Sequence, residues 1–217
     1  MTNRLLTWRP RFDEKSRKYG IAHTLPVMQL ARRSMQWSCP VYFDQSEEPS
    51  CTGFAMTHAV MSDPFPNKNL TPPHARYLYQ RAKELDQWPG DDYEGSSVLG
   101  AAAAAKELNW VKSYHWCFTE YEISTAIGYY GPVAFGSQWT QGMMEPDDRG
   151  VIRALGKPLG GHAYLLTGYD AARDLYRIHN SWGISWGKMG DAFIQSRDID
   201  ALMREGAEAC ALTKAAE

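Results

Sequence analysis

The two halves of this 217-residue chain carry different patterns, and that asymmetry limits the folds open to it. Between residues 51 and 109, apolar side chains recur at three-to-four spacing, which predicts three helices, at about 51–61, 72–86 and 97–109. Later in the chain, short β-like runs bounded by Gly, Asp and Asn predict strands at 131–135, 162–169, 175–178 and 191–195. A helix-rich half followed by a strand-rich half predicts an α+β fold with two lobes and a cleft between them.

Local signals refine these expected elements. Pro72-Pro73 is expected to open the second helix, and Ser96 or Ser97 to cap the third through a side-chain oxygen. A further helix is expected at Tyr121–Tyr129, directly before the first β-like run. No internal repeat is visible.

Composition excludes several classes of protein. With 44% hydrophobic and 22% charged residues, the chain is too apolar for wholesale disorder, and eight Trp and 12 Tyr favour a substantial core. No apolar run approaches the ~18 residues that a membrane-spanning helix needs, so no membrane association is expected. The first residues do not resemble a signal peptide, which predicts a cytoplasmic protein; phage association or export by a non-classical route is the alternative.

The N-terminal segment 1–38, called the arm from here on, differs in charge from the rest of the chain. Residues 1–37 hold eight Lys or Arg against two acids, whereas residues 38–217 hold fifteen against 23. A solvated leader, an arm packed on the acidic body and an arm bound to an anionic partner are the open alternatives. The body has no basic stripe interleaved with aromatic residues, so nucleic-acid binding is not expected.

The four cysteines are widely spaced, which is typical of free thiols rather than of a disulfide scaffold or a zinc site. Cys39 and Cys117 are expected to be structural thiols. His58 is expected to face a core or the lobe interface, and His179 to have a surface or structural role, because strand alternation points its side chain away from that of Asn180. No metal and no cofactor are predicted.

Cys51 stands at the start of a predicted helix, where free N–H groups and the positive end of the helix dipole favour thiolate over thiol. A thiolate is the reactive form, and a nearby imidazole can take up its proton. Far downstream, His162 follows Gly160-Gly161 and opens a predicted strand.

Three motifs surround these residues. Gln45 precedes Cys51 by six positions, His162 begins a Gly-His-Ala motif, and Asn180 begins Asn-Ser-Trp-Gly-x-x-Trp-Gly-x-x-Gly. Together, and in the order Gln, Cys, His, Asn, they resemble the papain-like cysteine peptidases over roughly residues 38–200. The resemblance implies a papain-like two-lobed fold, with a helical lobe at about 39–110, an antiparallel β-barrel-like lobe at about 111–205, and the active site in the cleft. The expected division is therefore the arm at 1–38 and a catalytic domain at 39–217.

The same resemblance implies roles for single residues. Cys51 would be the nucleophile, His162 its acid and base, Asn180 the group that orients the His162 ring, and Gln45 an oxyanion donor beside the Cys51 backbone N–H. Four further residues would contact or border the polypeptide substrate. Trp182 would shield the Asn180–His162 hydrogen bond, Trp186 would form a wall on the leaving-group side, and Gly95 and Gly161 would bind substrate.

The chain departs from the usual family pattern just before the nucleophile. Glu48 stands where family members commonly have a Cys, so that family disulfide cannot form, and Pro49 replaces a Gly that shapes the first substrate pocket. Thr52 in place of Trp is similar to bacterial and viral members. Glu47 and Glu48 beside the cleft predict a preference for a basic residue at or near the cleaved bond.

The expected activity is hydrolysis of peptide bonds through a thioester on Cys51. Cell-wall peptide or an isopeptide bond as the substrate, acyl transfer to an amine, and a non-catalytic peptide-binding assembly protein are the alternatives. The arm is left open as a structural segment, a short self-inhibitory plug, or a cleaved or partner-binding piece. The oligomeric state is not predicted.

Overall fold

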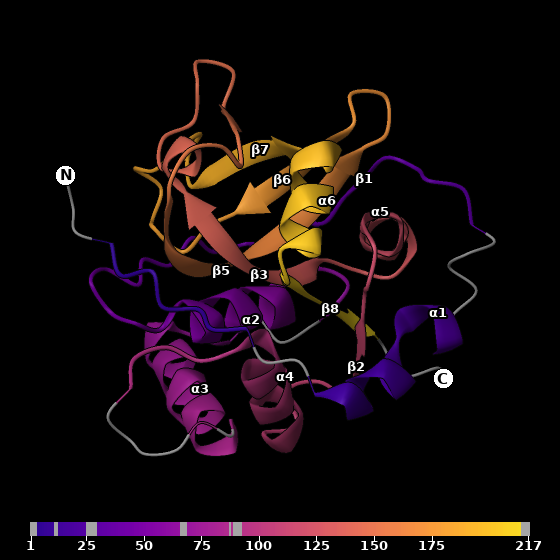
Figure 1. Cartoon of the computed structure of the whole chain (residues 1–217). Coiled ribbons are helices and arrows are strands. Elements are labelled where there is room, and N and C mark those ends of the chain that lie inside the picture. The colour runs from indigo at the N-terminus through magenta and orange to yellow at the C-terminus, as the bar shows by residue number, and fades with distance from the viewer. Residues whose placement is uncertain are drawn as a thin grey trace.

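A computed structural model describes residues 4–10, 13–24, 30–65, 69–86, 88 and 93–213. Helices α2, α3 and α4 lie below the sheet, α5 and α6 lie beside its upper part, and the short α1 lies apart from both groups, on the side of β2 (Figure 1). They are α1 Ile21–Thr24, α2 Cys51–Met61, α3 Pro72–Leu85, α4 Val98–Glu107, α5 Glu120–Tyr129 and α6 Ser196–Arg204, with short 3-10 helices at Glu14–Tyr19 and Gln141–Met143. None of the described helices is both long and apolar enough to cross a membrane.

The strands form a single mixed sheet in the order β2-β8-β3-β5-β6-β7-β4, with β1 paired to β5. Their bounds are β1 Met35–Gln36, β2 Ser113–Trp116, β3 Val133–Thr140, β4 Val151–Ile152, β5 Pro158–Asp170, β6 Leu175–His179, β7 Asp191–Gln195 and β8 Glu208–Thr213. The pairing is antiparallel except between β4 and β7. The four predicted strands are present as β3, β5, β6 and β7, while β2, β4, β8 and α6 lie where no element was expected.

Helix boundaries follow the local chemistry of the sequence. Ser97, one of the two expected caps, accepts the Gly100 backbone N–H at 2.9 Å and starts α4. Thr119 and Glu122 form a capping box that starts α5, in which each side chain accepts a backbone N–H of the other residue. These bonds satisfy donors that a helix N-terminus otherwise leaves open.

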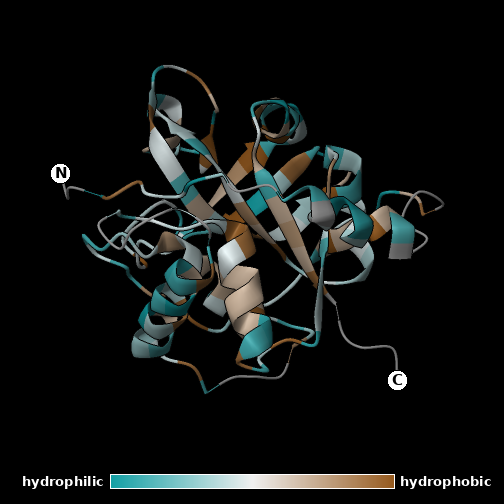
Figure 2. Cartoon of the chain, turned by 60° about the horizontal axis from the view of Figure 1, so that its bottom comes forward, coloured by the Kyte–Doolittle hydropathy of each residue, from teal (hydrophilic) through white to brown (hydrophobic). Residues whose placement is uncertain are grey.

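Two apolar cores sit on either side of the junction between helices and sheet. One joins α2, α3 and α4, and the other joins the sheet to α5 and α6. Apolar residues are concentrated in the strands and along the inner faces of the helices (Figure 2). Small side chains at Ala101, Ala102, Ala104 and Ala105 let α4 pack closely, as the alanine run predicts.

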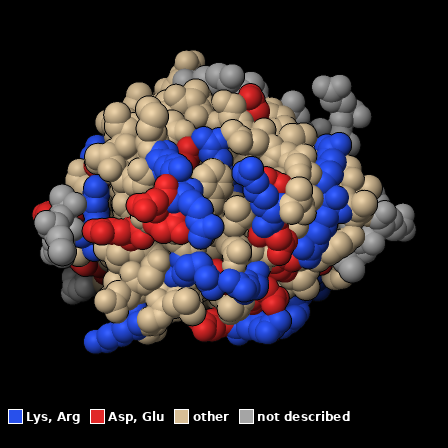
Figure 3. Space-filling model, turned by 90° about the horizontal axis from the view of Figure 1, so that it is seen from above, with Lys and Arg blue, Asp and Glu red and all other residues tan. Residues whose placement is uncertain are grey.

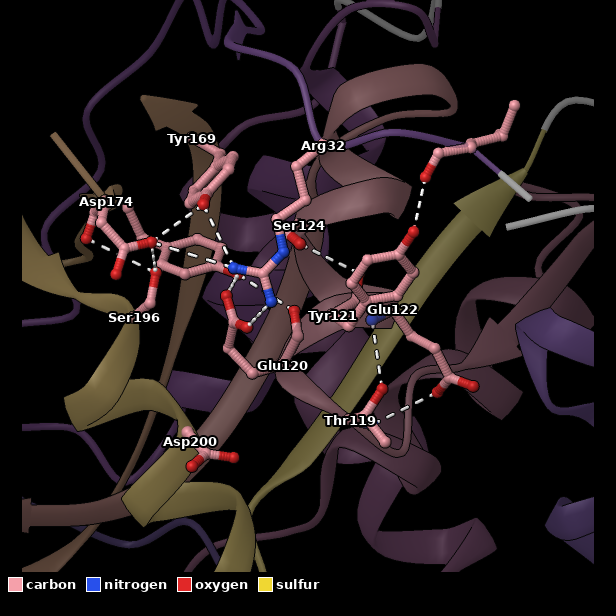
Figure 4. Close-up of polar contacts among 12 residues, drawn as sticks. Arg32, Thr119, Glu120, Tyr121, Glu122, Ser124, Tyr169, Asp174, Ser196 and Asp200 are labelled. Atoms are coloured by element: carbon pink, nitrogen blue, oxygen red, sulfur yellow. Dashed lines mark hydrogen bonds and ion pairs between the residues drawn. The ribbon is translucent and has the colours of Figure 1, made fainter. Parts of the chain in front are cut away.

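A polar network fixes the C-terminal part of the arm to the β-rich side (Figure 4). Arg32 forms an ion pair with Glu120 at the start of α5, and its guanidinium also donates to the Tyr169 hydroxyl at 3.3 Å. The Tyr121 hydroxyl donates to the Leu30 carbonyl at 2.6 Å. Because Glu120 is only 7% exposed, its charge depends on Arg32, which holds this segment against the β-rich side.

Candidate active site

The sulfur of Cys51 lies where the first helix of the body meets the sheet. Cys51 begins α2, and its thiol interacts with the backbone of Ala163 on β5 and of Thr7 in the arm. The residue has no exposed surface. Burial raises the pKa of the Cys51 thiol above its usual value, against the lowering effect of these hydrogen bonds. With the arm in place, the sulfur is therefore held as a neutral thiol.

His162 directly precedes Ala163, the residue of β5 whose backbone contacts the Cys51 thiol, and the strand register pairs it with Ser137 on β3. Its Nε2 hydrogen-bonds Asn180 Oδ1 at 2.8 Å, and its Nδ1 is buried with no hydrogen-bond partner among the described residues. Burial lowers the pKa of His162 to about 4, the Asn180 bond opposes this, and the Arg4 charge adds to it. The imidazole is thus neutral in this state.

Two indoles pack against the imidazole, and a third packs on them. The Trp182 ring lies 4.8 Å from the His162 ring, and Trp139 meets it edge-on at 5.0 Å. Trp186 packs on Trp182 at 5.4 Å and donates its indole N–H to the Met144 carbonyl at 2.8 Å. Water is excluded on this side, which strengthens the His162–Asn180 hydrogen bond. Trp139 was not expected at the site. It lies on β3, and only the pairing of β3 with β5 brings it beside His162.

Gln45 is buried directly upstream of the helix that starts at Cys51. Its backbone N–H donates to the Ser181 carbonyl at 2.8 Å, and its side-chain oxygen accepts the Ser181 hydroxyl at 2.6 Å. The side-chain nitrogen donates to the Glu48 carbonyl at 2.9 Å. An amide nitrogen carries two hydrogens, so one of them stays available for a developing oxyanion. These bonds hold the Gln45 side chain in one position, and one of its two amide hydrogens is already donated to Glu48.

The arm runs directly over these residues. Thr7 pairs with Gly161 in a parallel bridge, and its hydroxyl lies 3.9 Å from the Cys51 sulfur. The Trp8 N–H donates to the Gly161 carbonyl at 2.8 Å. A Cβ built on Gly95, whose φ is +90°, would lie 1.7 Å from the Thr7 carbonyl oxygen. The two glycines predicted to bind substrate therefore border the arm from opposite sides.

The Trp8 side chain fills a pocket beside Cys51. It is 4% exposed, and its indole N–H donates to the Glu208 carboxylate at 2.9 Å. The same carboxylate oxygen accepts the Val98 N–H at 2.8 Å. A Cβ on Gly136 would lie 2.2 Å from the indole nitrogen, so this glycine leaves the space that the ring occupies. Glu208 was not singled out from the sequence, because 200 residues separate it from Trp8.

The other end of the described arm is tied down by charge. Arg4 forms an ion pair with Asp44 at 2.5 Å and donates to the Trp182 carbonyl at 3.2 Å, with its guanidinium 5.6 Å from the Trp182 ring centre. The Arg9 backbone N–H donates to the Ser96 carbonyl at 3.0 Å. Contacts thus extend along the arm on both sides of Thr7. Of the three charge-based alternatives for the arm, packing on the acidic body is the one observed.

The expected acidic pair beside the nucleophile is arranged differently from the prediction. Glu48 is half-buried, and both of its carboxylate oxygens accept the Arg76 Nε–H, at 2.7 and 2.9 Å. Glu47 is exposed. The Glu48 charge is therefore compensated within the chain, whereas Glu208 is the carboxylate that reaches into the pocket beside Cys51.

A hollow of about 1240 Å³ lies away from Cys51, between β1 and the strands β4 to β7. Five basic residues and three aspartates are among those that line it. On the face seen in Figure 3, basic and acidic side chains are interspersed rather than segregated.

Comparison with known proteins identifies the architecture. The model of a family described as papain family cysteine protease matches residues 38–213. The chain belongs to the papain family of cysteine proteases. The predicted papain-like α+β fold with two lobes is confirmed, and so is the expected enzyme class.

Solved structures of papain-like proteases support the same fold. Xylellain, a cysteine protease from Xylella fastidiosa, superposes with a TM-score of 0.71 at 14% identity over 97% of this chain and 96% of that chain. Procathepsin B S9 from Trypanosoma congolense gives 0.66 at 13% identity over 96% and 86%. Bromelain from Ananas comosus, in complex with the E64 inhibitor, gives 0.60 at 16% identity over 85% and 100%. The match to xylellain agrees with the expected similarity to bacterial members of the papain family.

A curated protein matches over a short segment. Gamete and mating-type specific protein A from Dictyostelium discoideum is 48% identical over 42 residues, which are 19% of this chain and 9% of that protein. This papain-family chain thus spans a small part of that relative's length.

Proposed function

We propose that this papain-family chain hydrolyses peptide bonds through a thioester on Cys51. The observation that carries the proposal is the placement of a helix-start thiol against the β5 backbone at Ala163, the residue that follows a histidine whose ring is fixed by Asn180. His162 would take the thiol proton as the sulfur attacks the scissile carbonyl, and would return it to the leaving amine. Water would then cleave the thioester, with His162 again accepting a proton.

The neighbouring groups have supporting roles in this proposal. Asn180 Oδ1 accepts from the protonated Nε2 and so keeps Nδ1, the other ring nitrogen, as the proton acceptor. Trp182 and Trp139 keep water from that bond. The free hydrogen of the Gln45 amide and the Cys51 backbone N–H would stabilise the oxyanion. Gly95 and Gly161 would pair with the substrate backbone as they now border the arm.

We further propose that the arm at 1–38 is a self-inhibitory plug on a catalytic domain at 39–217, in which the lobes divide near residue 110. Cys51 has no exposed surface, and the Thr7 hydroxyl lies 3.9 Å from its sulfur. With the arm in place, the shifts of both pKa values favour a neutral thiol and a neutral imidazole. Displacing the arm would readmit water and remove the Arg4 charge from His162, both of which favour the reactive ion pair.

The pocket that holds Trp8 would select a substrate side chain with an N–H donor at its tip. Glu208 already accepts an indole N–H there, and a Lys or Arg side chain would bring both a donor and a compensating charge. This keeps the expected preference for a basic residue but moves its cause from Glu47 and Glu48 to Glu208. Reporter peptides with Arg, Lys or Glu at the position next to the cleaved residue would measure it.

A polypeptide substrate follows from the family, whereas cell-wall peptide or an isopeptide bond as the substrate stays a proposal. The bacterial or phage origin and the cytoplasmic location are proposals as well. Incubation with casein and with purified peptidoglycan separates a general polypeptide substrate from cell-wall peptide. The decisive test of the mechanism is labelling by E64, the inhibitor in the bromelain structure, followed by intact mass. One adduct in the wild type and none in Cys51→Ala would support the thioester mechanism. No adduct even after the arm is released would contradict it and favour a non-catalytic peptide-binding protein.

A further inference from the structure

The guanidinium of Arg4 lies in a seat that the body of the chain provides. Its two terminal nitrogens face the two carboxylate oxygens of Asp44, at 2.5 and 3.4 Å. They also donate to the Ser46 carbonyl at 3.4 Å and to the Trp182 carbonyl at 3.2 Å. The guanidinium carbon lies 5.6 Å from the centre of the Trp182 ring, and the Arg4 side chain is only 10% exposed. A carboxylate, carbonyl oxygens and an aromatic face are the partners that suit a planar guanidinium. We call Asp44, Ser46 and Trp182 the arginine seat.

The arginine seat is held in place by contacts within the body. Asp44 pairs with Trp182 in an antiparallel bridge. The Ser46 backbone N–H donates to Asp44 Oδ1 at 2.7 Å, which fixes the direction of the carboxylate. On the other side of the carboxylate, a Cβ on Gly183 would lie 3.1 Å from Asp44 Oδ2, so this glycine leaves room for it. None of these contacts involves the arm, so the seat is organised for a guanidinium even when Arg4 leaves it.

The charge of Asp44 is compensated by a different part of the chain than that of Asp191. Asp191 pairs with Arg177, and its Oδ1 lies 3.2 Å from His179 Nδ1, so its partners belong to the body itself. The ion pair described for Asp44 is with Arg4, which belongs to the arm. Displacement of the arm would therefore remove the cation from Asp44 while the residues that orient the carboxylate stay in place.

The arginine seat borders the proposed catalytic residues. The Trp182 ring lies 4.8 Å from the His162 ring. Burial is the main cause of the low pKa of His162, and the charge of Arg4 lowers that pKa further, so the seat is close to the imidazole. Arg4 precedes Thr7 by three positions, and the Thr7 hydroxyl lies 3.9 Å from the Cys51 sulfur. Three residues of extended chain span about 10 Å at most. A peptide bound at Cys51 can therefore place a nearby side chain in the seat.

The arm passes the sulfur at Thr7, so its residues on either side of Thr7 lie in opposite halves of the groove. Trp8 fills its pocket in one half, and Arg4 occupies the arginine seat in the other. Trp186, which is expected on the leaving-group side, packs on Trp182 at 5.4 Å. The seat thus belongs to the half of the groove that would hold the leaving group.

We propose that the arginine seat is a substrate subsite, at which this protease prefers an Arg within the first three residues after the cleaved bond. The inference rests on the proposed hydrolysis at Cys51, and Asp44 is its specificity-determining residue. A Lys side chain can meet the carboxylate but cannot reach the carbonyls as well, because its ammonium is a compact point charge. A substrate Arg would bring its charge to the place of the Arg4 charge, which eases proton transfer from His162 to the leaving amine.

The test uses the full-length Arg4→Ala chain, in which the arm no longer fills the arginine seat. Internally quenched peptides are made in pairs that carry either Arg or citrulline, its uncharged analogue, at the first, second or third position after the cleaved bond. Mass spectrometry of the products confirms which bond is cut. The ratio of the two kcat/KM values does not depend on how often the arm is undocked, because that fraction multiplies both of them.

We expect the ratio to favour Arg at one of the three positions. Hydrogen bonds to a charged group change an equilibrium by about 10- to 100-fold. Asp44 is 42% exposed, so solvent screening places the expected preference near the lower limit, at about tenfold. Equal kcat/KM values for Arg and citrulline at all three positions would overturn the proposal, and this comparison needs no variant of Asp44.

A charge-removing variant assigns the preference to Asp44. Asp44→Asn keeps the oxygen that accepts the Ser46 N–H but lacks the charge, so in the Arg4→Ala background it should abolish the preference for Arg. Asp200→Asn is the matched control, because it removes a carboxylate of α6 that pairs with Arg204, and it should leave the preference intact. A preference for Arg that survives Asp44→Asn in a folded chain would overturn the assignment.

A binding measurement separates the arginine seat from the proposed hydrolysis. Acetyl-arginine amide and acetyl-citrulline amide are titrated into the full-length Arg4→Ala/Cys51→Ala chain, and the indole N–H signals are followed by NMR. Tighter binding of the arginine amide, lost in Asp44→Asn, would support the seat even if neither peptide of a pair is cut, in which case only the proposed hydrolysis fails. If neither peptide is cut and the two amides bind equally, the seat is refuted as well.

Discussion

Replacing Trp8 by Ala should uncover the nucleophile. The ring is 4% exposed in its pocket beside Cys51 and holds the arm there through apolar contact and one hydrogen bond to Glu208. The backbone bond from Trp8 to Gly161 remains in the variant, so the substitution weakens the seat of the arm without deleting the arm.

The magnitude follows from the buried area. A Trp side chain buries about 150–250 Å², which at about 25 cal/mol per Å² corresponds to about 4–6 kcal/mol. Removal of a buried Trp typically costs about 3–5 kcal/mol. We take about 3 kcal/mol of this as the loss in docking free energy of the arm. The fraction of molecules with the arm undocked, the open fraction, then rises about 10²-fold.

The assay is the rate of E64 labelling of Cys51, followed by intact mass. If the arm opens and closes faster than labelling, the rate is proportional to the open fraction and should rise about 10²-fold in Trp8→Ala. Tyr19→Ala is the matched control, since it removes a 58%-exposed aromatic ring from the same arm. A folded Trp8→Ala chain, judged by circular dichroism, that labels as slowly as the wild type would refute the plug.

Three further outcomes are expected. Cys51→Ala should abolish turnover and leave the thermal midpoint within a few degrees of the wild type; residual activity would disprove its role. Asn180→Ala should lower kcat about 10²-fold with little change in KM, because it frees the His162 ring rather than a substrate contact. The pKa of His179, raised to about 9, lies above its unfolded value of ~6.5, so its contribution is fully present below about pH 6.5 and is lost as the pH rises through about 9. Calorimetry of the wild type and Asp191→Asn between pH 6 and pH 10 should show that loss in the wild type alone.

Sequence patterns predicted the parts of the fold that rest on local regularity. The helices from Cys51 and Pro72 have clear periodicity and start signals, and both appear within a residue of the expected bounds. Strand β8 was missed because Glu208–Thr213 is short and alanine-rich, and becomes a strand only through its partners β2 and β3. The amphipathic helix α6 was missed for want of a cap: Gln195 precedes it and makes no side-chain capping bond.

In the site, too, local features could be predicted from the sequence and long-range contacts could not. The motifs around Cys51, His162 and Asn180 are short and local, so they could be found without coordinates. The path of the arm could not, because Trp8 and Glu208 are distant in sequence and neither belongs to a repeating pattern. The opposite charges of arm and body were the available signal, and they indicated contact without its place.

Because the arm and Cys51 share one polypeptide, the proposed plug would act at an effective concentration set by the tether rather than by the amount of protein. For flexible tethers that value is of millimolar order, and the Arg32 anchor fixes the far end of this one. Dilution should therefore leave the covered fraction unchanged, and a peptide that competes for the groove must exceed this local concentration before it binds. Activation by spontaneous opening would follow first-order kinetics at every enzyme concentration, whereas cutting of one arm by another molecule would accelerate as the protein is concentrated.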